Sequence, residues 1–352
     1  MQLPMASTWW RALQRALAWS STMYALTALL LCLIFVGFCL AADRIHDDIG
    51  LRLGAKLALL ELHPGLIFAG DSRTAQQVDP ALAASVMGQR LGYAINIGVI
   101  GNDPLAVLAA VRERPGDFRH ADLVLNLSPY HINDGSKKEF FFSTNAIARM
   151  DLMQKLQTFL LDRPQTLLWF IRASFEEFAW RRQHAAAPAP IPARLGLEDP
   201  STAAHIVREP GNTGAPDLPF RYTDFLNTEI GVYEGYSYYR AWRPDGFKAG
   251  LVEAALCELR PLVRRLVIVA PPWAPILQFT KRPAWRALEG QFHDVISAMA
   301  RQCGFEFLNI SEVPGLGFED FLDEAHISRS GMPAYTEYLM DRLGYRRSSP
   351  PS

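Results

Sequence analysis

The chain is 352 residues long, the size of one large domain or of two modest ones. Its 36 acidic and 35 basic side chains leave a net charge of −1, so no positive excess indicates a nucleic acid as the partner. A hydrophobic fraction of 49% excludes a disordered chain, and four cysteines are too few for a disulfide scaffold. The sequence holds no spacing typical of a metal site and no nucleotide-binding motif, so we expect no metal and no cofactor.

Residues 23–42 form an apolar stretch, MYALTALLLCLIFVGFCLAA, long enough as a helix to cross a bilayer of about 30 Å. Arg11 and Arg15 precede it and aspartates follow it. This charge bias predicts a single transmembrane helix with residues 1–22 in the cytoplasm and the rest exported across the inner membrane. The alternative is a cleaved signal peptide, whose apolar region would be shorter. Both alternatives export the remainder of the chain.

The exported part begins with an expected linker, residues 43–63, that contains a helix over 51–62. From residue 64 to residue 345, short apolar runs alternate with helical patterns, and 346–352 form a tail. The alternation predicts βαβ units, and therefore a three-layer α/β/α domain with a mostly parallel sheet. The expected strands are 66–69, 93–97, 123–127, 266–270 and 306–310, and the expected helices are 80–90, 104–112, 247–264, 283–303 and 330–343.

A large helical and irregular insertion, residues 140–247, is expected between the third and fourth strands. Its aromatic residues over 222–242 either form a platform for a sugar or belong to the core of the insertion. Likewise Arg240 and Arg243 either meet an anionic acceptor or form surface ion pairs. Beyond the insertion, Cys257 and Cys303 lie on expected helices and are able to pair in an oxidising compartment, although spacing alone does not decide it.

The candidate chemistry lies where the first and last strands end. Gly70, Asp71 and Ser72 follow the first strand, at the sheet edge where parallel sheets bind ligands. Ser72 is either a nucleophile or the cap of the next helix, and the adjacent Arg73 is a candidate for orienting the substrate.

After the last strand, Asp323 precedes His326 by three residues, a spacing that lets the carboxylate hold the imidazole toward a nucleophile. The alternative is that His326 is an ordinary surface histidine. Both segments follow strand ends on one edge of the sheet, which favours the functional interpretation.

These two segments resemble the first and last blocks of the SGNH (GDSL-type) hydrolase superfamily over roughly residues 64–345. The resemblance implies a flavodoxin-like fold with Ser72 as nucleophile, His326 as general base and Asp323 as its orienting group. Gly98, in Asn96-Ile97-Gly98, matches the second block, which implies that its N–H binds the oxyanion.

The third block departs from the family pattern, Gly-x-Asn-Asp. Residues 127–134 read LSPYHIND, so the third oxyanion donor passes to Ser128, Tyr130 or Asn133, or the site has altered chemistry. Losing one such donor typically costs two to three orders of magnitude in rate.

The combination of membrane span, SGNH-like domain and insertion resembles the envelope acyl-transfer branch, which includes DltD proteins and alginate O-acetylation proteins. That resemblance implies a partner, a multipass membrane-bound O-acyltransferase (MBOAT). The expected function is a membrane-anchored, serine-dependent O-acyltransferase that passes an acetyl or D-alanyl group through an acyl-serine to an envelope polysaccharide or polyol polymer. Two alternatives stay open: an envelope carbohydrate esterase of the same fold, and a non-catalytic protein that binds polymer or serves as a scaffold.

Overall fold

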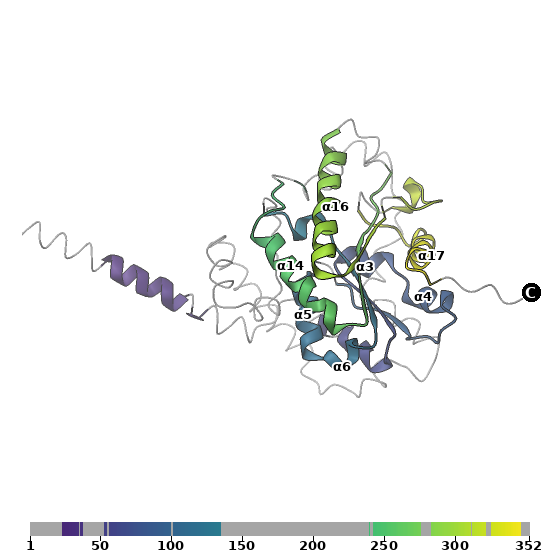
Figure 1. Cartoon of the computed structure of the whole chain (residues 1–352), viewed down its shortest axis with the longest axis horizontal. Coiled ribbons are helices and arrows are strands. Elements are labelled where there is room, and N and C mark those ends of the chain that lie inside the picture. Colours follow the sequence, from purple (N-terminus) through teal and green to yellow (C-terminus); the bar gives the residue numbers. More distant parts are fainter. Residues whose placement is uncertain are drawn as a thin grey trace, which may run out of the picture.

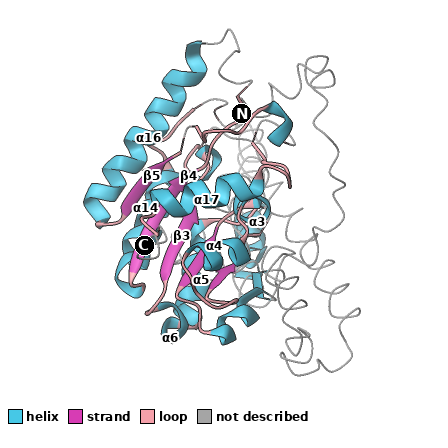
Figure 2. Ribbon diagram, turned by 90° about the vertical axis from the view of Figure 1, so that its right-hand side faces the viewer, coloured by secondary structure: helices cyan, strands magenta, loops and turns pink. Residues whose placement is uncertain are grey.

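The computed structural model describes residues 23–34, 36–37, 53–54, 56–99, 101–134, 239, 242–275, 283–310, 312–321 and 325–345. Within these residues, five strands form one sheet with helices on both of its faces (Figures 1 and 2). The strand order is β2-β1-β3-β4-β5, and every neighbouring pair is parallel. The predicted α/β fold with a parallel sheet is confirmed. The strands are β1 (Leu66–Ala69), β2 (Ala94–Asn96), β3 (Asp122–Asn126), β4 (Arg265–Ala270) and β5 (Glu306–Asn309).

Two layers of helices cover the sheet (Figure 1). In one layer α17 contacts both α3 and α4, and in the other α14 contacts both α5 and α16. The first layer comprises α3 (Ser72–Gln77), α4 (Pro80–Val86) and α17 (Met332–Arg342). The second comprises α5 (Pro104–Glu113), α14 (Phe247–Leu259) and α16 (Pro283–Cys303). Short helices complete the domain: α6 (Pro115–Phe118) and the 3-10 helices η1 (Leu57–Leu62), η2 (Pro129–His131), η3 (Arg260–Leu262) and η4 (Phe318–Asp320).

The local sequence explains why these elements form. Every residue of β1 and β3 is buried, as expected for strands that are covered on both faces. The side chains of Asp79 and Asp103 accept amide hydrogen bonds at the start of α4 and α5, and a proline follows each aspartate. A capping aspartate followed by proline at the first helical position is a strong start signal for a helix.

Several elements differ from the sequence predictions, among them α4, which was expected over 80–90 and ends at Val86. The predicted linker helix is largely the 3-10 helix η1, and Leu53, Leu57 and Leu60 are buried in the domain core. The helix predicted over 247–264 ends at Leu259, because η3 and then β4 follow it. Finally, the six-residue helix α3 was not among the expected helices.

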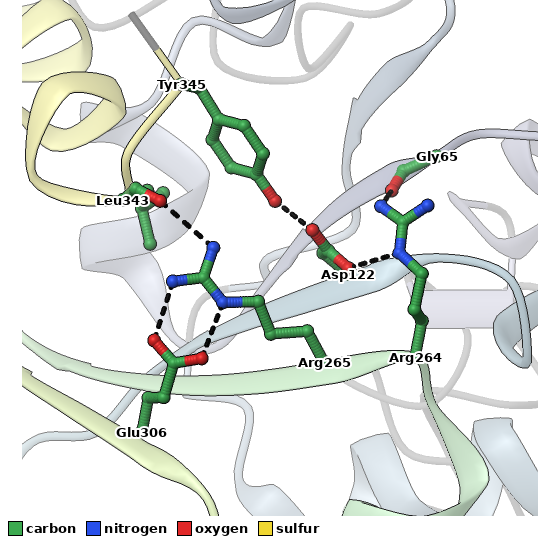
Figure 3. A network of polar contacts seen from close by, with 7 residues as sticks. All are labelled: Gly65, Asp122, Arg264, Arg265, Glu306, Leu343 and Tyr345. Carbon is green, nitrogen blue, oxygen red and sulfur yellow. Dashed lines mark hydrogen bonds and ion pairs between the residues drawn. The ribbon is translucent and has the colours of Figure 1, made fainter.

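A polar network joins the strands at their amino-terminal ends, the edge opposite the predicted site (Figure 3). The Arg265 guanidinium donates two hydrogen bonds to the Glu306 carboxylate, at 2.7 and 2.6 Å, and a third to the Leu343 carbonyl. Asp122 accepts hydrogen bonds from Arg264 and from the Tyr345 hydroxyl. These contacts attach the segment after α17 to the sheet.

Cys257 of α14 and Cys303 of α16 form a disulfide, which confirms that the two are able to pair. Residues 23–34 and 36–37 are helical, with apolar side chains exposed. Among the described residues, no helix is long and apolar enough to cross a membrane. Residues 140–238 of the predicted insertion and the tail 346–352 lie outside the described residues.

Candidate active site

The strand order creates a position for a ligand between β1 and β3. From β1 the chain passes to β2 on one side of the sheet, and from β2 it crosses to β3 on the other side. In open parallel sheets, ligands bind outside the carboxyl ends of the strands where the order reverses in this way. Ser72 follows β1 and Ser128 follows β3, so both side chains belong to this position.

The Ser72 hydroxyl lies 2.8 Å from Nε2 of His326, across 254 positions of sequence. Both side chains are half-buried, so the pair is open to solvent on one side. His326 belongs to a loop between η4 and α17 whose ends are joined by the Phe321–Ile327 bridge. The predicted juxtaposition of serine and histidine is confirmed. Asp323 lies outside the described residues, so its contact with His326 stays a prediction.

Asp71 fixes the start of the helix that carries Ser72. Its Oδ1 accepts the Arg73 amide at 2.9 Å, so Asp71 is the N-cap of α3 and Ser72 is the first helical residue. The preceding Gly70 has φ +135, and a Cβ there would lie 2.5 Å from Thr74 Oγ1. The glycine permits the sharp turn from β1 into α3 that brings Ser72 to the sheet edge.

Ser128 and Tyr130, two candidates for the third oxyanion donor, both donate their hydroxyls to Asp71 Oδ2, at 2.7 and 2.9 Å. Burial raises the Asp71 pKa. Proximity to the His131 ring and the Arg73 guanidinium, together with hydrogen bonds from Ser128 and the Arg73 amide, outweighs burial and holds this pKa below its usual value. An ionised carboxylate therefore accepts both hydroxyls, and their protons are directed at Asp71 instead of a substrate oxygen.

His131 joins the loops that follow β2 and β3. Its Nδ1 accepts the Ser128 amide at 2.9 Å, and its Nε2 donates to the Asn102 carbonyl at 2.9 Å. Burial lowers the His131 pKa despite the nearby Asp71 carboxylate, in agreement with a neutral ring. The neutral imidazole thus positions Ser128, and through it Asp71.

The predicted role of Gly98 is not met in this structure. Its N–H donates to Asn96 Oδ1 at 2.9 Å, so this amide already has an acceptor. A Cβ on Gly98 would lie 2.7 Å from Thr74 Cβ and 2.8 Å from the Ala75 nitrogen. The glycine is required because the loop after β2 packs directly against α3.

Sequence reasoning missed Gly101, the second glycine of the same loop. Gly101 is exposed and has φ +77, a conformation that favours glycine. No acceptor for its N–H is recorded within the described part of the chain. The signal that was overlooked is its place two residues before Asp103, the cap of α5, in the loop whose Asn102 carbonyl contacts His131.

Arg73 and Asn133, two further candidates, make structural hydrogen bonds within the domain. The Arg73 side chain, expected to orient the substrate, is 2% exposed. It donates to the carbonyls of Pro271 and Pro272, at 2.7 and 2.5 Å, and its guanidinium lies 4.3 Å from the centre of the Trp273 ring. The buried Asn133 accepts the Arg243 amide through Oδ1 at 2.9 Å, so it anchors the chain that enters α14.

Two rings of the proposed aromatic platform fall within the described residues. Tyr239 is 2% exposed and belongs to the core, with its ring centre 5.1 Å from that of Trp242. Tyr239 therefore packs in the interior, whereas the other aromatic residues of 222–238 lie outside the described residues, as does Arg240. Arg243 is exposed. No group of three or more histidine, cysteine or acidic side chains able to hold a metal ion occurs among the residues that the structure describes.

No known family model matches the sequence, and no curated protein matches it either. Among solved structures, the chain is similar to Axe2, an acetylxylan esterase from Geobacillus stearothermophilus, with 15% identity and a TM-score of 0.36 over 81% of this chain and 96% of that one. A catalytic mutant of the same esterase matches with 13% identity and a TM-score of 0.35 over the same shares. At this level of similarity, Axe2 determines neither the activity nor the substrate of this chain.

Proposed function

We propose that this protein is a serine-dependent acyl-transfer enzyme in which Ser72 is the nucleophile and His326 the general base. The observation that carries the proposal is the 2.8 Å contact between Ser72 Oγ and His326 Nε2. A serine within hydrogen-bonding distance of an imidazole is the arrangement that activates a hydroxyl for attack on an ester. The pair also lies at the carboxyl ends of the strands, where ligands bind in sheets of this order.

In the proposed reaction, the Ser72 oxygen attacks the ester carbonyl while its proton passes to His326 Nε2. The carbonyl oxygen becomes an oxyanion, and the tetrahedral intermediate collapses as Nε2 returns the proton to the departing alcohol. The resulting acyl-serine is then attacked by a second hydroxyl, whose proton passes to the same nitrogen. As the acyl–serine bond breaks, Nε2 returns this proton to the Ser72 oxygen, and the acyl group leaves on the second hydroxyl. Asp323 is proposed to orient the imidazole.

The backbone amides of Ser72 and Gly101 are the proposed oxyanion donors. Ser72 is the first residue of α3, so its N–H precedes the first intrahelical hydrogen bond. The amides of Arg73, Thr74 and Ala75 are taken up by Asp71, which leaves the Ser72 amide as the donor nearest the reacting oxygen. Donors that are fixed in advance toward a developing charge stabilise the transition state most strongly.

We infer further that the acceptor is a hydroxyl of a cell-envelope glycan and that an MBOAT-type partner supplies an acetyl or D-alanyl group. The support for this is the sequence resemblance to the envelope acyl-transfer branch. Hydrolysis is the second candidate, and a specific observation favours it: Ser72 and His326 are both partly exposed, so water is able to reach an acyl-serine.

The proposed location is the outer side of the inner membrane, with the domain anchored by the N-terminal apolar segment. Leu26, Leu30 and Leu33 of this segment are between 55% and 60% exposed. Exposing these apolar side chains to water is unfavourable, and insertion into a bilayer would remove that cost. The Cys257–Cys303 disulfide supports an exported domain, because disulfides persist in oxidising compartments. The state of these two thiols in the cell tests this placement.

The function is tested with the full chain in detergent and an activated acetyl ester. Replacement of Ser72 by alanine, or of His326 by alanine, is expected to lower kcat by at least about 10³-fold, since the two groups act as a unit. Ser297→Ala on α16 is the matched control and should retain full activity, because Ser297 is remote in sequence from both groups and makes none of the described side-chain hydrogen bonds. A folded Ser72→Ala protein with wild-type activity would disprove Ser72 as the nucleophile, whereas a wild-type protein without activity on any acyl ester would favour a polymer-binding scaffold.

The same assay separates the two acceptors when oligosaccharide is added. An acylated sugar, detected by mass spectrometry, supports transfer. Release of free acetate at an unchanged rate, with no acylated sugar, supports the esterase.

A further inference from the structure

Gln77, the last residue of α3, contacts the loop that carries the proposed base. Its side chain is completely buried. Its Nε2 donates a hydrogen bond of 2.6 Å to the carbonyl of Ala325, across 248 positions of sequence. Ala325 directly precedes His326. The helix that begins with the nucleophile therefore ends with a side chain that holds the backbone beside the base.

We propose that Gln77 is a positioning residue for the acyl-transfer reaction. Its hydrogen bond to Ala325 fixes the distance between α3 and the His326 loop, which keeps Nε2 of His326 within reach of Ser72 Oγ. The inference rests on the proposed roles of Ser72 and His326.

The chemistry of the contact explains why the residue is a glutamine. A carbonyl oxygen only accepts, so the amide has to present Nε2 to Ala325. The other end of the amide, Oε1, is buried with no hydrogen-bond partner within the described residues. A buried unsatisfied acceptor costs about 1–3 kcal/mol, a cost that a methionine of similar length would avoid. The single bond to Ala325 is therefore the favourable contribution of the polar group.

Two further contacts within the described residues hold the loop at its base. The Phe321–Ile327 bridge and the hydrogen bond from the Ser328 amide to the Asp320 carbonyl, 2.7 Å long, close the loop where it meets α17. Neither contact links the loop to α3. Gln77 supplies such a link in addition to the Ser72–His326 contact itself. A misplacement of about 1 Å in a catalytic group costs on the order of 100-fold in rate.

The test replaces Gln77 by methionine, which preserves length and burial but removes the donor. In the full chain, kcat for an activated acetyl ester should fall about 10- to 100-fold while KM changes less than about twofold, because substrate contacts are unchanged. Gln76→Met is the matched control. Gln76 is the neighbouring, half-exposed glutamine of the same helix, and none of the described hydrogen bonds involves its side chain, so wild-type kinetics are expected.

A second readout does not depend on turnover. The Cε1 proton resonance of His326, assigned by its loss in His326→Ala, is compared in wild type, Ser72→Ala and Gln77→Met. Because Gln77→Met should weaken the Ser72–His326 hydrogen bond, its resonance should move toward that of Ser72→Ala. A folded Gln77→Met protein with wild-type kcat and a wild-type resonance overturns the inference.

If the methionine variant does not fold, Gln77→Leu serves the same purpose, because a leucine side chain has no donor for the Ala325 carbonyl. It should show the same loss of kcat and the same shift of the His326 resonance, and wild-type values of both would overturn the inference. A wild-type protein that is inactive on every acyl ester would disprove the proposed function alone, since the resonance comparison still reports where His326 lies.

Discussion

The Asp71 carboxylate positions several of the groups around the nucleophile. One oxygen of its carboxylate accepts the Arg73 amide, and the other accepts the hydroxyls of Ser128 and Tyr130. The buried Arg73 guanidinium adds a positive charge close by. The carboxylate is the acceptor in all three hydrogen bonds, which favours its ionised form. The lowered Asp71 pKa agrees with an ionised carboxylate at neutral pH.

Replacing Asp71 by asparagine is expected to destabilise the protein by about 2–4 kcal/mol at pH 7, because it removes a carboxylate that faces the buried Arg73 charge and gives Ser128 and Tyr130 a weaker acceptor. A lowered pKa contributes stability that is fully present above the pKa of the unfolded chain, about 4, and is lost as the pH falls through the folded value. The difference in unfolding free energy between wild type and Asp71→Asn should therefore be largest above about pH 5 and shrink below about pH 4. Urea unfolding from pH 7 to pH 3 measures it.

The control for this pH dependence is Asp245→Asn, at an exposed aspartate before α14. Its unfolding free energy should stay within about 0.5 kcal/mol of wild type at every pH. A gap between wild type and Asp71→Asn that persists unchanged at pH 3 would contradict an ionised Asp71 as the source of the stability.

Helix α3 is the element on which the site depends. In six residues it carries Ser72 toward the imidazole, Arg73 toward the carbonyls after β4, and Gln77 toward the His326 loop. Gly98 lets this helix lie directly on the loop after β2. A small shift of α3 therefore moves the nucleophile relative to both neighbouring loops.

Gly98→Ala is expected to displace α3, because its Cβ would lie 2.7 Å from Thr74 Cβ and 2.8 Å from a backbone nitrogen that is unable to rotate away. Overpacking of this kind costs about 1–3 kcal/mol. We expect a lower Tm together with a lower kcat. Gly250→Ala on α14 is the matched control, since nothing lies within 4 Å of its added Cβ, and it should stabilise the helix by up to about 1 kcal/mol. Equal behaviour of the two variants would disprove close packing at Gly98.

Long elements with a strong hydrophobic pattern were predictable from the sequence, and short elements that bury polar residues were not. β1 and α16 have the predicted limits, because a fully apolar run and a 21-residue amphipathic pattern leave few alternatives. Helix α3 shows no such pattern in six residues, three of which are buried and polar. The juxtaposition of Ser72 and His326 followed from their places after parallel strands, whose carboxyl ends share one edge.

The site residues that were predicted wrongly share a physical cause. Arg73 was expected to orient a substrate because it is adjacent to Ser72, yet backbone carbonyls and an aromatic ring hold it in the interior. Gly98 and Gly101 are indistinguishable by type, and only the hydrogen bond of Gly98 and the positive φ of Gly101 separate them. Contacts made across the fold decide such cases, and residue type does not.

At the scale of the whole molecule, the Cys257–Cys303 disulfide joins α14 and α16 on one face of the sheet. The two cysteines are 46 positions apart, so on the chain-entropy account the bond stabilises the folded state by about 4 kcal/mol. A stabilisation of this size persists only where the compartment keeps the bond oxidised. The thiol state in living cells therefore reports on which side of the membrane the domain folds.

The prediction is tested in a Cys39→Ala background, which leaves three cysteines: Cys32, free and exposed, and the disulfide pair. Cells are quenched in acid, the chain is denatured, and free thiols are labelled with a maleimide polymer that retards migration. An exported domain should carry one label before reduction and three afterwards. Cys257→Ser provides the control, with two labels in both conditions, because Cys303 then has no partner. Three labels without reductant in the Cys39→Ala chain would mean that the domain folds in a reducing compartment, and would remove the proposed envelope location.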